Sequence, residues 1–204
     1  KKAASVESLT MQFETLLGSV TAAKKRMAEL QKFAKKTPFE VSELTRASKL
    51  LETMGGSVIS TGDGLRMVGD AASVAGQPIE EVALHIGRLF GALTSGTSAG
   101  ESVARLQELG LMTGTAKRGF ENLAASQKKG ESAVLSQDEA LKMLQQTFAK
   151  TEGAMDRLSA TTEGKLSNMK DSIDQLQVAF GTGFNDGLKV ALDAANKFLP
   201  ELEK

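Results

Sequence analysis

The chain contains no cysteine, tryptophan or tyrosine, and it has only three prolines and one histidine among its 204 residues. The lack of cysteine excludes disulfides and thiol chemistry, and it removes the sulfur ligands of a zinc site. Aromatic residues make up 4% of the chain and all of them are phenylalanine. A core must therefore be built from aliphatic side chains, which favours packed helices over a β-sandwich.

Charge of one sign is not in excess, because Lys plus Arg and Asp plus Glu each number 25. No overall electric field therefore draws the chain toward nucleic acid or anionic lipid. No apolar run approaches the roughly 20 residues that span a bilayer. The sequence has neither an initiator methionine nor a signal-peptide pattern, so we expect a fragment of a longer protein.

Apolar residues recur at helical spacing along most of the chain, and glycine or proline separates the stripes. We expect helices ending at Gly18, before Thr37, at Gly55 and at Gly76, and a fifth beginning at Pro78. Shorter helices are expected over 101–109 and 115–125, after a loop at 94–100. The five stripes consist of Val6, Leu9, Phe13, Leu16 and Leu17; Val20, Ala23, Met27, Leu30 and Ala34; Val41, Leu44, Ala47 and Leu51; Leu65, Val68 and Ala72; and Val82, Ile86, Leu89, Phe90 and Leu93.

Two short patterns predict where helices begin. In the first pattern, Thr37 fits the N-cap position and Pro38 the first helical position. Glu40 follows the cap by three residues and completes a capping box. Ser136 and Glu139 fit a second capping box. Ser19 can cap the second helix, and Thr61 or Asp63 the fourth.

Gly69 interrupts the fourth helix at a cost of about 1 kcal/mol relative to alanine, so we expect it to mark close packing against a neighbour. From Ser136 onward the apolar spacing continues as far as Phe180. This spacing predicts one long helix with weak points at Gly153 and Gly164, followed by a break at 181–183 and a terminal helix over 184–199.

The resulting fold prediction is all-α, a compact array of about seven to nine helices with a long C-terminal amphipathic helix. We expect residues 1–150 to form the compact module. Residues 151–204 are expected to form the long amphipathic helix and the terminal helix, leading toward an extended region.

Reactive side chains are few, and each has a simpler structural explanation. His85 has no second histidine or cysteine with which to build a metal or nucleophile site, so a structural role is expected. The acidic pairs at 80–81 and 138–139 fall in first helical turns, where capping and dipole effects explain them. No glycine cluster follows a strand, so no phosphate loop is expected. We predict no catalytic, cofactor-binding or metal-binding residue.

Lys25, Lys32 and Lys36 share one helix face opposite Met27 and Leu30. We call these three lysines the basic face. A solvated surface explains it, and contact with DNA phosphates or acidic walls is the alternative. Residues 82–93 are apolar enough to suggest membrane insertion, but they are too short to span a bilayer and carry charges, which favours a buried core helix.

Four segments, in the same order and at similar spacing, resemble the conserved N-terminal region of phage and prophage tail tape-measure proteins. They are residues 13–19, 33–40, 65–72 and 164–171. The motif residues are Thr37, Pro38, Phe39, Glu40, Gly69, Asp70, Gly164, Leu166, Ser167 and Asn168.

This resemblance implies a structural virion protein without a catalytic step. In that family the polypeptide lies along the tail lumen, its length sets the number of tail-tube rings, and it is later expelled so that DNA can enter the host. It is in the host cytoplasm during assembly. Its partners would be other tail proteins (tube, tail-tip or chaperone) and copies of itself. No cofactor is implied.

Within such a protein, a module with many helix breaks suits anchoring or packing better than measuring length. A second hypothesis is a membrane- or DNA-acting module that aids genome passage, suggested by the basic face and by residues 82–93. A third is an enzyme domain such as a muramidase, for which the candidate acidic residues are Glu80, Glu81, Glu139 and Glu163.

Overall fold

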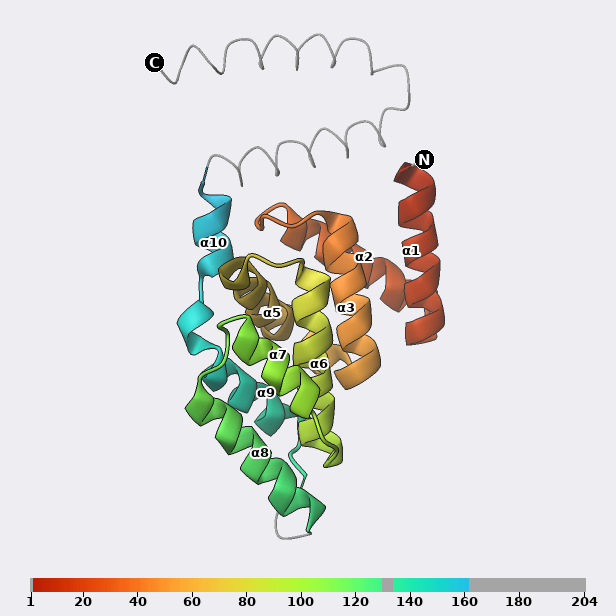
Figure 1. Cartoon of the computed structure of the whole chain (residues 1–204). Helices are drawn as coiled ribbons and strands as arrows, with labels where there is room; N and C mark the ends of the chain where they lie inside the picture. The colour runs from red at the N-terminus through yellow and green to blue at the C-terminus, as the bar shows by residue number, and fades with distance from the viewer. Residues whose placement is uncertain (1, 130–133, 162–204) are drawn as a thin grey trace, which may run out of the picture.

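The computed structural model describes residues 2–129 and 134–161, and within these ranges it contains helices and no strand (Figure 1). The all-α prediction is confirmed. The helices are α1 (Lys2–Leu17), α2 (Val20–Ala34), α3 (Val41–Gly55), α4 (Ser57–Ser60), α5 (Gly62–Ala75), α6 (Ile79–Ser95), α7 (Gly100–Glu108), α8 (Gly114–Lys128), α9 (Gln137–Thr147), the 3-10 helix η1 (Ala149–Thr151) and α10 (Ala154–Ser159).

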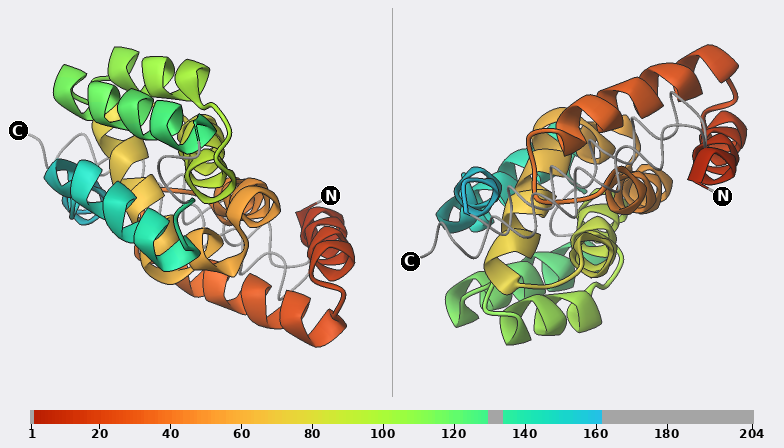
Figure 2. Two further views of the ribbon diagram at one scale, coloured as in Figure 1. Left: turned by 90° about the horizontal axis from the view of Figure 1, so that it is seen from below. Right: turned by 90° about the horizontal axis from the view of Figure 1, so that it is seen from above.

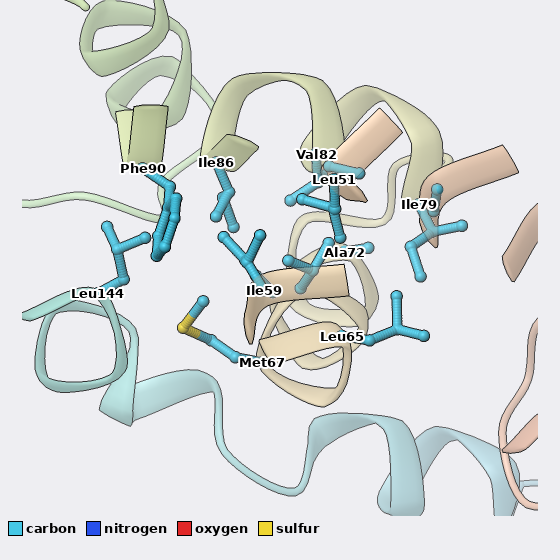
Figure 3. Packing of buried hydrophobic residues seen from close by; sticks show 14 of the residues in the cluster. Leu51, Ile59, Leu65, Met67, Ala72, Ile79, Val82, Ile86, Phe90 and Leu144 are labelled. Carbon is cyan, nitrogen blue, oxygen red and sulfur yellow. The ribbon is translucent and has the colours of Figure 1, made fainter. Parts of the chain in front are cut away.

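Helix α6 forms the centre of the array and packs against α3, α5, α7 and α9. Its buried side chains point to several sides, and Figure 3 shows Ile86 and Phe90 facing Ile59 and Leu144 from other helices. Residues 82–93 are thus core, as predicted. Among the described residues, no helix is long and apolar enough to cross a membrane.

Two glycines allow α3 and α6 to approach each other closely. A Cβ placed on Gly87 of α6 would lie 2.7 Å from the sulfur of Met54, and one on Gly55 of α3 would collide with the ring of Phe90. Larger residues there would push the two helices apart, because interiors are packed without spare volume.

The remaining helices surround this pair. Viewed along the vertical axis of Figure 1, α2 runs along one side of the array, whereas α7 and α8 lie on the opposite side (Figure 2). Helix α1 packs on one end of α2 and also contacts α3. The chain leaves α9 through η1, and α10 then lies beside α5 (Figure 1).

Most predicted helix boundaries are confirmed. The hydroxyl of Ser19 accepts a hydrogen bond from the backbone N–H of Ala22 at 3.2 Å. Ser136 and Glu139 form the predicted capping box at the start of α9. Gly76 ends α5 in the left-handed conformation with φ +61°, which glycine adopts without a steric penalty.

The capping prediction at Thr37 is wrong. Helix α3 begins at Val41, its N-cap is Glu40, and the reciprocal partner is Glu43, whose carboxylate accepts from the N–H of Glu40 at 2.8 Å. Thr37 is buried and donates its hydroxyl to the carbonyl of Ala34. Phe39 packs against the core, so the chain completes a turn over residues 35–39 before the helix starts.

The prediction of one continuous helix from Ser136 is also wrong within the described residues. Helix α9 ends at Thr147, and Gly153 adopts φ +73° before the six-residue α10. A left-handed residue cannot continue a right-handed helix, so the apolar spacing persists across a sharp change of direction. Gly164, Leu166, Ser167, Asn168 and the predicted helix over 184–199 lie outside the described residues.

Candidate functional site

The most specific polar contacts with the C-terminal part of the described chain are made by α5. The residue that makes them is Asp70, which is only 2% exposed. Its Oδ2 accepts from the N–H of Gly153 at 3.0 Å, and its Oδ1 accepts from the N–H of Met155 at 2.8 Å. An ionised carboxylate makes stronger hydrogen bonds than a neutral acceptor. Asp70 therefore fixes the point at which α10 begins.

Gly69 makes room for the same segment. A Cβ on Gly69 would collide with the sulfur of Met155, and the Met155 side chain is fully buried. The predicted close packing at Gly69 is thus confirmed, and the neighbour is Met155. We refer to Gly69 and Asp70 on α5, with Gly153 and Met155, as the α5 junction.

Further contacts join α10 to the end of α2. Arg66 of α5 pairs with Asp156 at 3.3 Å and stacks over the ring of Phe33 at 5.9 Å from its centroid. The Ser159 hydroxyl lies 3.4 Å from the carbonyl oxygen of Lys36. Segments 33–40 and 65–72, which are far apart in sequence, therefore both contact α10 or its partner Arg66, close to the α5 junction.

A second buried polar cluster ties α2 to α3 and α4. The Arg26 guanidinium donates to Glu52 at 2.9 Å and to the hydroxyls of Ser48 and Ser60 at 3.3 and 3.0 Å. It also lies over the ring of Phe13, 5.6 Å from the centroid. A further bond runs from the guanidinium to the Ser57 hydroxyl at 3.2 Å, so the buried charge has both a carboxylate partner and several hydroxyl acceptors, as a buried charge requires.

Ionisation of Glu52 is favoured by this cluster. Burial raises the pKa of Glu52, but hydrogen bonds from Ser60 and Arg26, together with the positive charge of Arg26, outweigh that effect. Its pKa therefore lies below the ordinary value for a glutamate. The ion pair between Arg26 and Glu52 was not predicted from the sequence. The available signal was the position of Arg26 within the buried stripe, between Ala23 and Leu30.

The lysines of the predicted basic face lie on α2 (Lys25 and Lys32) and in the turn that follows it (Lys36). Lys25, Lys32 and Lys36 are all exposed. None of them forms an ion pair with a described residue. The face is separate from the Asp70 contacts, although Lys36 is connected to α10 through its carbonyl oxygen.

The other titratable candidates have structural surroundings. His85 is buried on α6, with its Nδ1 3.4 Å from the Ser102 hydroxyl. Burial lowers the pKa of His85, and the positive charge of Arg88 lowers it further. The carboxylates in the first turn of α6 are paired: Glu80 with Arg46 at 2.8 Å, and Glu81 with Arg105 at 2.7 Å.

Metal ligands do not gather in the part of the chain that the structure describes, where no three His, Asp or Glu side chains converge. The motif residues serve packing and capping instead. Thr37 is buried, Pro38 and Phe39 are half-buried, Glu40 caps α3, and the pair at 69–70 holds α10. This arrangement can bind and orient a polypeptide segment.

Residues 1–182 match a family described as tape measure protein. No curated protein and no solved structure matches the chain. The family match covers most of the 204 residues and includes all four segments singled out in the sequence. The chain therefore belongs to the tape measure protein family, and its role is a structural one in the phage tail.

Proposed function

We propose that the helical array is an anchoring module that holds the polypeptide following it during tail assembly. Residues beyond α10 would lead into the part of the protein that sets tail length and later leaves the tail, so that DNA can be ejected. The α5 junction carries this proposal. Asp70 is buried, and its carboxylate accepts hydrogen bonds from the backbone N–H groups of Gly153 and Met155 in the C-terminal part of the described chain.

Dimensions argue against the array itself being the ruler. A single helix of 204 residues would reach about 300 Å at 1.5 Å per residue. The longest described helix, α6, has 17 residues, which corresponds to about 26 Å. The described helices also fold back on one another, so the array spans a much shorter distance than a single helix of the same number of residues would.

An anchor needs a partner on the tail side. The lumen of the tail, with the tube, tail-tip or chaperone proteins, is the setting that the family suggests, and other copies of this chain are a further candidate. The basic face supports contact with an acidic protein surface, because its three lysines are exposed without an ion pair to any described residue.

The anchoring role can be tested in the phage or prophage that encodes the full-length protein. Asp70→Asn and Gly69→Leu weaken the α5 junction without altering the downstream sequence. We expect fewer complete tails in electron micrographs, and an unchanged length for the tails that do form. Asp138→Asn is the matched control, since Asp138 is an exposed carboxylate in the first turn of α9. Tails of altered length at normal yield would contradict anchoring and favour a measuring role.

A second candidate is a module that acts on DNA or a membrane during genome passage. The observation that favours it is again the basic face. Triple substitution of Lys25, Lys32 and Lys36 by glutamate should then abolish retention on heparin and lower the salt slope of DNA binding. Equal retention of the parent and the substituted protein would remove this candidate, as would the failure of micromolar protein to release dye from anionic liposomes in the membrane case.

A further inference from the structure

His85 is the one side chain of this protein whose ordinary pKa lies near neutral pH. The chain has a single histidine and no cysteine. Among unperturbed side chains, only histidine changes its charge between about pH 5 and 8. A conformational change of the protein in that pH range can therefore be assigned to His85.

This histidine lies in the contact between α6 and α7. It is 8% exposed, and its Nδ1 is 3.4 Å from the hydroxyl of Ser102 on α7, which is 1% exposed. An ion pair lies on either side of this contact: Glu81 with Arg105 at 2.7 Å, and Arg88 with Glu101 at 3.9 Å. The residue numbers rise along α6 as they fall along α7, so the two helices run antiparallel and these three contacts follow one another along them.

A positive charge on the His85 ring is unfavourable in these surroundings. Burial removes the water that would solvate an imidazolium, and the positive charges of Arg88 and Arg105 act in the same direction. The carboxylates of Glu81 and Glu101 favour the charge, but each is already paired with one of these arginines. The pKa of His85 is therefore lowered, with burial as the largest cause.

Charged side chains on the other helices packed against α6 are engaged elsewhere or exposed. The charged residues of α9 are exposed. On α3 and α5, Arg46 pairs with Glu80, Glu52 pairs with Arg26, and Asp70 accepts from the backbone at the start of α10. The balance of charge at His85 is therefore set within the α6–α7 contact.

Helices α7 and α8 form a hairpin that is attached to the array chiefly through α7 (Figure 2). We call residues 100–128 the α7–α8 hairpin. Phe120 is the only buried side chain among those described on α8. An open cavity of about 270 Å³ lies between the end of α6 and the hairpin, lined in part by Leu93, Val103 and Phe120. Segments with few buried apolar contacts open at a lower free energy than the rest of a protein.

The chain also has a turning point just before this hairpin. Gly96 ends α6 in the left-handed conformation, with φ +70°. Glycine changes its backbone conformation with little steric penalty. The hairpin can therefore move relative to α6 by rotation at this residue.

We propose that His85 makes the attachment of the α7–α8 hairpin pH-sensitive, so that protonation of its ring releases the hairpin from α6 below about pH 6.5. The proton binds to the ring nitrogen that carries none at neutral pH, and water solvates the imidazolium once α7 has moved away. Opening uncovers the apolar side of α7, which includes Val103 and Leu106.

The size of the effect is limited by proton linkage. The ring has a pKa of about 6.5 when it is solvated and a lower one when α7 covers it. The closed form is therefore fully favoured above about pH 6.5, and it loses stability as the pH falls toward the lower pKa. Between about pH 7.5 and 5.5, this raises the equilibrium constant for opening by at most about tenfold.

A histidine titration and hydrogen exchange test the proposal on the full chain. The single ring gives one unambiguous NMR signal, and we expect its titration midpoint to lie below about 6.5. After correction for the intrinsic pH dependence of exchange, the amides of α7 should exchange about three- to tenfold faster at about pH 5.5 than at about pH 7.5. The amides of α3 and α9 should be equally protected at both.

Three variants separate the charge of the ring from its packing. His85→Gln keeps an amide that can bond to Ser102 but does not titrate, so the pH dependence of exchange in α7 should disappear. Arg88→Gln removes a nearby positive charge and should raise the titration midpoint of His85. Lys142→Gln is the matched control at an exposed position on α9, and it should leave the midpoint unchanged.

A midpoint at or above about 6.5 would overturn the proposal, and so would exchange in α7 that stays constant across the titration. Equal acceleration in α3 and α9 would overturn it as well, because the whole array would then be unfolding. If His85→Gln does not fold, the midpoints of the parent, Arg88→Gln and Lys142→Gln still decide.

This inference does not require the anchoring role. The titration and the exchange are measured on purified protein, whereas anchoring is measured by the yield and length of assembled tails. A failure of one therefore leaves the other standing.

Discussion

Removing the carboxylate of Asp70 is the sharpest perturbation of the α5 junction. Asp70→Ala deletes the acceptor for two backbone N–H groups, those of Gly153 and Met155. Met155 is fully buried, so its N–H would lose its partner without access to water. Gly153 is partly exposed, so water can replace the carboxylate there.

The size of the effect follows from these two bonds. A hydrogen bond to a charged group contributes about 1.5–3 kcal/mol. We take the lower end for each, because one donor can be rehydrated, and expect a loss of about 3 kcal/mol. A chain of this size changes its melting temperature by about 2–4 °C per kcal/mol, so the expected decrease is about 6–12 °C. Asp70→Asn keeps one acceptor oxygen, and we expect about half that loss.

Thermal and urea denaturation followed by circular dichroism measure the global effect, and hydrogen exchange at the Met155 amide measures the local one. Asp138→Ala is the control, because an exposed carboxylate in a first helical turn contributes at most about 1 kcal/mol. If Asp70→Ala behaves like this control in the melt, and the Met155 amide stays equally protected, the junction does not hold α10 and the reasoning fails.

Three further predictions test other contacts. Gly69→Leu should destabilise the fold by about 1–3 kcal/mol through overpacking against Met155, whereas Gly119→Ala in α8, where a Cβ meets nothing within 4 Å, should be neutral or stabilising in the same melt. Glu43→Ala should cost about 1 kcal/mol, because it removes the carboxylate that accepts from the Glu40 N–H; an unchanged melt would show that this capping box contributes nothing. Because the pKa of Glu52 is lowered in the folded state, its contribution is complete above the unfolded pKa of about 4.3 and disappears as the pH falls through the folded pKa. Glu52→Gln should therefore lower the free energy of unfolding by roughly 1–3 kcal/mol at pH 7, and this difference from the parent should shrink as the pH falls below about 4.3. The free energy is measured by urea denaturation at each pH, and a difference that stays constant with pH would contradict the assignment.

The periodic part of the fold was predictable because it depends on near neighbours in sequence. A helix stripe such as Ala23, Met27 and Leu30 repeats every three or four residues, and all three are buried as expected. A glycine at a helix end, as at Gly76, signals its own backbone conformation. These features need no knowledge of which helix packs on which.

The errors fall where long-range packing overrides a local pattern. Thr37, Pro38 and Glu40 satisfy the spacing of a capping box, yet burying Thr37 and packing Phe39 on the core delays the helix until Val41. Apolar spacing also continues from α9 into α10, although the backbone turns at Gly153. An apolar stripe predicts which residues become buried, but it does not predict whether the helix continues without a break between them.

The two buried polar residues Arg26 and Asp70 differ in how far their contacts could be predicted from the sequence. Arg26 could have been recognised, because it stands within an apolar stripe and must find a buried partner such as Glu52. Asp70 could not, because its partners are backbone N–H groups more than 80 residues away, and any residue type except proline supplies such a group. No complementary side chain therefore appears in the sequence. The same independence from side-chain identity means that the segment held by Asp70 can vary in sequence, provided that it turns at a residue like Gly153 and offers a side chain that fits against Gly69.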